Sequence, residues 1–130
     1  MIVKRLIRPE RRRHVPPGFN WVDHRLVSQN FIGRCDPPAL ALYLFLITVS
    51  DVQGLSYYSD AAISRRLKMD LVQLTAARQQ LVQTDLVAYQ KPLYQVLALD
   101  SPISQEPAAE RTGQAQSAGD ILRRLLGGAS

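Results

Sequence analysis

Apolar residues recur at helical spacing over residues 36–50, 59–67 and 70–83, and strand-like apolar runs follow at 86–89 and 93–97. The first of these segments is apolar on nearly every side, so we expect a helix buried on several faces or covered by a second copy of the chain. The third carries one apolar stripe, made by Leu71, Leu74, Ala77, Leu81 and Val82. The pattern therefore predicts a helix, a pair of consecutive helices and a hairpin.

Residues typical of helix starts and turns stand at the edges of these segments. Asp36 precedes two prolines, which favours a helix start because the first turn loses no amide hydrogen bond there. Ser59 is a predicted N-cap, and Asp70 with Gln73 three residues later has the spacing of a capping box. Asp85 stands at the turn before the first strand of the hairpin, a position where aspartate tolerates a left-handed conformation.

Two helices joined by the corner 68–70 and followed by a hairpin are the layout of a winged helix-turn-helix. We expect 55–58 to add a short strand to the hairpin, and Tyr89 and Tyr94 to be cross-strand partners beside its tip. The predicted fold class is mainly α with a small β-hairpin (α+β). The predicted divisions are a basic arm at 1–17, the winged domain at 18–100, a polar linker at 101–119 and a short amphipathic helix at 120–127.

The order of these segments resembles that of a known class of DNA-binding domain. The similarity lies in the apolar segment 40–46, the turn 51–54, the stretch 57–67 and the stretch 81–89. It is to the winged helix-turn-helix domains of bacterial and phage replication initiators and mobile-element proteins, and more distantly to multiple-antibiotic-resistance-type repressors. This resemblance implies that the helix from Leu71 reads DNA and that the hairpin after Leu86 is the wing. Those families usually have glycine where Asp85 stands.

In this class the outward side chains of the second helix meet base edges. Glutamine can bond adenine through both amide atoms, and threonine or alanine can pack on a thymine methyl group. The candidate base-reading residues are Gln73, Thr75, Ala76 and Gln79. The candidate phosphate-binding residues are basic side chains on or near the helix pair, at the hairpin tip and in the arm. They are Arg65, Arg66, Lys68, Arg78, Lys91, Arg11, Arg12 and Arg13.

The net positive charge of the chain lies in the first thirteen residues. They hold six basic residues against Glu10, which accounts for the whole net charge of +5. Such a block suits contact with phosphates. We expect Phe19 and Trp21, which follow the arm, to fasten its end to the core.

No pattern for catalysis is present. His14 and His24 stand apart from any cysteine or acid at ligand spacing, and neither a phosphate loop nor a nucleophile motif occurs. We therefore expect no enzyme, no metal and no cofactor. The single cysteine, Cys35, and the absence of a secretory or membrane-spanning pattern indicate a cytoplasmic protein without membrane contact.

Three expectations concern partners. The leading one is double-stranded DNA, bound by a small bacterial regulator or an accessory factor of a mobile element or replicon. The alternative is a winged-helix adaptor that binds protein rather than a DNA sequence. A homodimer is expected because the apolar helix 36–50 needs cover. The C-terminal helix either binds a protein partner or folds back onto its own domain or a dimer mate. It would use an apolar face made of Ile121, Leu122, Leu125 and Leu126.

Overall fold

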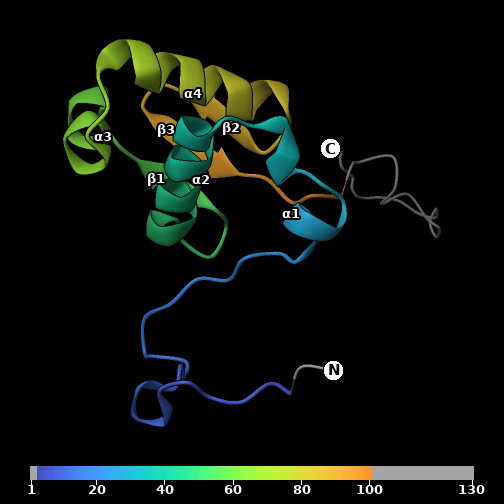
Figure 1. Cartoon of the computed structure of the whole chain (residues 1–130). Helices are drawn as coiled ribbons and strands as arrows, with labels where there is room; N and C mark the ends of the chain where they lie inside the picture. The colour runs from blue at the N-terminus through green and yellow to red at the C-terminus, as the bar shows by residue number, and fades with distance from the viewer. Residues whose placement is uncertain (1–2, 101–130) are drawn as a thin grey trace, which may run out of the picture. The chain divides into compact units, whose positions relative to one another are not determined.

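The computed structural model describes residues 3–100, and the elements follow in the predicted order (Figure 1). Single turns of 3-10 helix lie at Pro9–Arg11 and Ile32–Arg34. The helices and strands are α1 (Arg25–Ser28), α2 (Pro37–Val49), β1 (Leu55–Tyr57), α3 (Asp60–Leu67), α4 (Leu71–Gln83), β2 (Val87–Gln90) and β3 (Leu93–Val96). This is an α+β fold with winged helix-turn-helix topology, as predicted.

The three strands form one antiparallel sheet in the order β1-β3-β2. Ser56 pairs with Tyr94 across β1 and β3, and Tyr89 pairs with Tyr94 across the hairpin. The rings of Tyr89 and Tyr94 lie 4.6 Å apart, centroid to centroid. The predicted extra strand and the predicted tyrosine pair are both confirmed.

Local capping explains where the helix pair begins. The Ser59 hydroxyl accepts a hydrogen bond from the Ala62 amide at 3.1 Å, at the start of α3. Asp70 accepts from the Gln73 amide at 2.7 Å, and the Gln73 side chain accepts from the Asp70 amide at 3.2 Å, which completes the predicted capping box of α4. Asp85 adopts the left-handed conformation, with φ 62°.

Asp36 acts differently from the predicted cap. Its side chain makes no capping bond to α2. Instead, the Asp36 amide donates to Gln80 Oε1 at 2.6 Å, and Gln80 Nε2 donates to Asp36 Oδ2 at 3.0 Å. The first residues of α2 are therefore tied to α4.

Helix α2 is the centre of the core. Leu42 and Leu46 are fully buried, and α4 and β3 pack against the helix. Its one large, well-exposed apolar side chain is Leu44, at 61%. A single copy of the chain thus buries most of this helix. The homodimer remains a prediction, but the need to cover α2 no longer supports it.

The two aromatic residues after the arm do not fasten it to the core. Phe19 is 65% exposed and Trp21 is 71% exposed. Between them, Asn20 supplies the contact, because its Nδ2 donates to the Ser50 carbonyl at 3.0 Å. The last turn of a helix leaves carbonyl groups without intrahelical partners, and a polar amide satisfies them better than an aromatic ring.

Gly54 lies where the turn after α2 passes close to β3. Its φ is +85°, and a Cβ atom there would lie 2.6 Å from the backbone oxygen of Val96. We expect Gly54→Ala to lower the free energy of unfolding by about 1–2 kcal/mol, because both the conformation and the contact exclude a side chain. Gly18→Ala is the matched control, since a Cβ there meets nothing within 4 Å. Urea unfolding compares them, and equal stabilities would contradict the prediction.

The predicted linker and C-terminal helix, with Ile121, Leu122, Leu125 and Leu126, lie outside the described residues. Within residues 3–100, no helix combines the length and the apolar character needed to cross a membrane.

Candidate nucleic-acid interface

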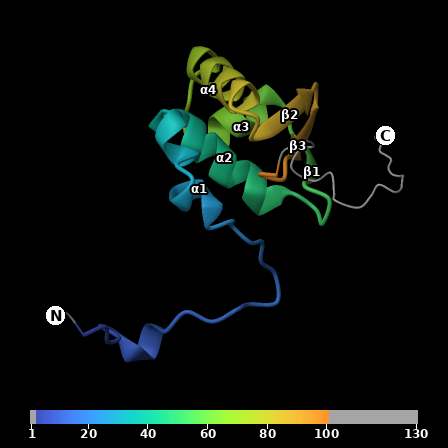
Figure 2. The same cartoon turned by 90° about the vertical axis from the view of Figure 1, so that its right-hand side faces the viewer.

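The outer face of α4 is the surface opposite its buried stripe. Leu74, Ala77 and Leu81 point into the core. Thr75, Ala76 and Gln79 are exposed, and in both views no other helix or strand of the described chain covers this side of α4 (Figures 1 and 2). The face carries amide, hydroxyl and methyl groups and no charge, which are the groups that read base edges.

Val72 lies on the same face and is absent from the residues selected by sequence. It is 79% exposed, one turn before Thr75 and Ala76. Its spacing signals its place, because residues three, four and seven apart share one side of a helix. A methyl-bearing side chain at the start of α4 adds a contact suited to thymine.

Gln73 has a second task that limits its use as a reader. Its side-chain oxygen accepts from the Asp70 amide at 3.2 Å in the capping box. An adenine contact through both amide atoms would require this bond to break. Gln79 is exposed and has no part in the capping box, so it is the better placed of the two glutamines for such a contact.

Basic side chains surround the corner between α3 and α4. Arg65 and Arg66 are exposed in the last turn of α3, and Lys68 is exposed at the corner with φ 57°. Met69 lies beneath the corner and is 9% exposed, so the bend is held by an apolar contact. Lys91 is exposed at the tip of the hairpin. These four residues are all open to solvent, as a phosphate contact requires.

Arg78 is placed differently from the other predicted phosphate ligands. Its side chain is only 13% exposed and pairs with Asp60 Oδ1 at 2.9 Å. The same nitrogen donates to the Tyr94 hydroxyl at 2.9 Å, and the guanidinium lies 4.4 Å from the Tyr89 ring centroid. Arg78 therefore joins α4 to the start of α3 and to the hairpin, and it is not available to phosphate.

The surroundings of Arg78 and Tyr94 shift the pKa of both side chains upward. Burial opposes the charge of Arg78, but the hydrogen bonds to Asp60 and Tyr94, together with the electrostatic effects of Tyr94 and Tyr89, raise the pKa of Arg78 above its ordinary value. Burial also raises the pKa of Tyr94, and the bond from Arg78 offsets part of that rise. The arginine thus stays charged and the tyrosine neutral near pH 7.

The arm residues Arg11, Arg12 and Arg13 are exposed, like the whole of residues 3–22. Arg8 is held by Glu10 at 2.9 Å, an exposed pair. The arm is attached to the domain through Asn20 at the end of α2, and the start of α2 is tied to α4 through Gln80. The attachment of the arm and the Gln80 contact of α4 therefore lie at opposite ends of α2.

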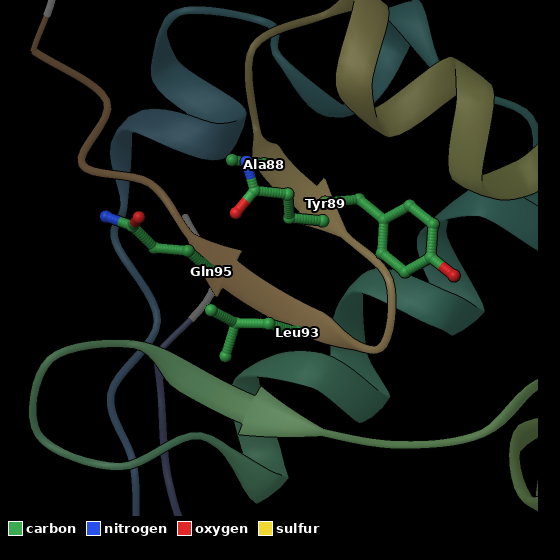
Figure 3. A pocket seen from close by; sticks show the side chains of 5 residues that line it. Ala88, Tyr89, Leu93 and Gln95 are labelled. Atoms are coloured by element: carbon green, nitrogen blue, oxygen red, sulfur yellow. The ribbon is translucent and has the colours of Figure 1, made fainter.

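The hairpin bears a hollow of about 240 Å³ (Figure 3). It is lined by Ala88, Tyr89, Gln90, Leu93 and Gln95. The hollow is smaller than most small-molecule sites, and its lining carries no acid, base or nucleophile suited to catalysis.

Within the described part of the chain, no three His, Cys, Asp or Glu side chains are grouped so that they could hold a metal ion. Comparisons with protein-family models, with curated proteins and with solved structures gave no match.

Proposed function

We propose that this protein is a DNA-binding protein that lays α4 in a major groove and reads base edges with its outer face. The observation that carries the proposal is the uncharged, exposed face of Val72, Thr75, Ala76 and Gln79 beside the exposed cations of α3. Uncharged donors, acceptors and methyl groups discriminate between bases, and neighbouring cations hold the phosphates on either side. The resemblance to replication and mobile-element proteins favours a regulator or accessory factor of such an element.

Selection of bound sequences from random duplex, repeated at several salt concentrations, tests the proposal. Gln79→Ala should relax the preference at one or two base positions, by about 1–3 kcal/mol. Gln53→Ala is the matched control, because Gln53 is exposed in the turn after α2. If Gln79→Ala and the control give the same preference profile as the parent, α4 is not the reader.

The phosphate contacts should behave differently in the same experiment. Replacing both Arg65 and Arg66 with glutamine should weaken every sequence alike and reduce the slope of affinity against salt by about one unit per lost contact. Lack of any binding to mixed duplex at low salt would contradict the proposal as a whole.

Two exposed apolar residues favour the second candidate, an adaptor that binds protein. Leu71 is 58% exposed and Val72 is 79% exposed at the start of α4. An adaptor would use them as anchors and would bind duplex only through its net charge. Its selected sequences would then show no preference, in the parent as well as in Gln79→Ala.

A further inference from the structure

The basic arm begins on the side of the domain that lies away from α4. Asn20 Nδ2 donates to the Ser50 carbonyl at 3.0 Å and reaches the Thr48 carbonyl at 3.5 Å, both at the end of α2. The start of α2 is bound to α4 by the paired contacts of Asp36 and Gln80. Both views show the arm leaving the domain at the end of α2 that is remote from α4 (Figures 1 and 2).

The length of α2 separates the contact of Asn20 with Ser50 from the contact of Asp36 with Gln80. Its 13 residues span about 20 Å, which is the diameter of a DNA duplex. From Asn20 to Arg13 the chain reaches at most about 24 Å when extended. The cluster at Arg11–Arg13 would therefore have to turn back along α2 to meet a duplex on the outer face of α4.

The sequence of the arm opposes such a turn. Pro16 and Pro17 lie between Asn20 and the three arginines, and they favour an extended chain over a tight reversal. Glu10 is occupied by Arg8, so it does not neutralise the arginines that follow. The arm therefore presents Arg11, Arg12 and Arg13 to the solvent on its own side of the domain.

From this arrangement we infer that the arm binds the phosphate backbone of a second duplex while α4 occupies the first. The inference rests on the proposed function, since it needs a duplex on α4. One copy of the chain then bridges two DNA segments. Helix α4 selects the sequence of the first, and the arm binds the phosphates of the second whatever its sequence.

Trp21 provides a signal specific to the arm. It is the single tryptophan of the chain, it is 71% exposed, and it follows the anchoring residue Asn20 directly. Its fluorescence should change when a duplex lies against the arm and should stay constant when a duplex occupies α4 alone. Phe19, on the other side of Asn20, has no comparable emission and does not obscure the signal.

The experiment measures capture of one duplex by another. A duplex carrying the selected sequence is fixed to beads, the full chain is added at low salt, and a second, fluorescent duplex of mixed sequence follows. The parent should retain the second duplex, with a change in Trp21 emission on its addition. In the triple variant, Arg11, Arg12 and Arg13 are all replaced by glutamine. It should retain at least about tenfold less of the second duplex than the parent, because three phosphate contacts are removed. The amount of variant held by the first duplex is measured in the same assay, and capture is compared per molecule of protein held on the beads.

Each outcome separates the inference from the function on which it rests. Full capture by the triple variant would mean that something other than the arm bridges the duplexes, such as two α4 faces in a dimer, and would overturn the inference. Binding of the first duplex with a Trp21 change and no capture would place the arm on the same duplex, which also overturns it while the proposed function stands. Lack of binding to the fixed duplex would overturn both. Circular dichroism of the variant confirms that its fold is unchanged.

Discussion

Leu46→Ala should lower the free energy of unfolding by about 3–4 kcal/mol. Leu46 is fully buried in α2, where α4 and β3 pack, and truncation removes apolar contacts and leaves a cavity that a close-packed core cannot refill. Urea unfolding followed by circular dichroism measures the change, and the Tm should fall by more than about 10 °C.

Leu44→Ala is its control and tests the homodimer. Leu44 is on the same helix and is 61% exposed, so its truncation should cost less than about 0.5 kcal/mol in a monomer. If a second copy covers this side chain, the cost should exceed 1 kcal/mol and the Tm should rise with protein concentration. A small, concentration-independent effect would count against a dimer through α2. Equal effects of both truncations would contradict the described packing.

Arg78→Ala should cost about 2–4 kcal/mol, the second largest effect. The substitution removes a mostly buried cation and leaves the Asp60 carboxylate and the buried Tyr94 hydroxyl without their common donor. It also removes the contact with the Tyr89 ring. Because these partners belong to α3 and the hairpin, the loss should loosen both against α4.

Arg66→Ala is the matched control for Arg78→Ala. Arg66 is an exposed arginine on the neighbouring helix, so its removal should leave stability within about 0.5 kcal/mol while weakening DNA binding. Loss of Arg78 should therefore lower stability, whereas loss of Arg66 should lower the affinity for DNA. A stability loss in Arg66→Ala as large as in Arg78→Ala would contradict the assignment of Arg78 to the structural cluster.

Features that depend on residues close together in the chain can be predicted from the sequence. The Ser59 cap, the capping box of Asp70 and Gln73, and the left-handed turn at Asp85 all follow from spacing of three residues or fewer. The order of helices and strands follows from periodicity, because helical and extended segments expose different sets of positions. Most of the outward face of α4 follows from the same rule, but Leu71 and Val82 of the predicted apolar stripe are 58% and 41% exposed.

Contacts between polar groups that are far apart in the chain depend on the packing of the whole fold. Arg78 and Tyr94 lie 16 residues apart, and Asp36 and Gln80 lie 44 apart, so no local pattern indicates either contact. Three further features also depend on long-range packing. They are the exposure of Phe19 and Trp21, the burial of α2 within one chain, and the contact of Asn20 with the end of α2. Periodicity indicates which side of a helix or strand is apolar. It does not indicate which neighbour packs on that side or where the arm is attached, because both depend on how all the elements pack together.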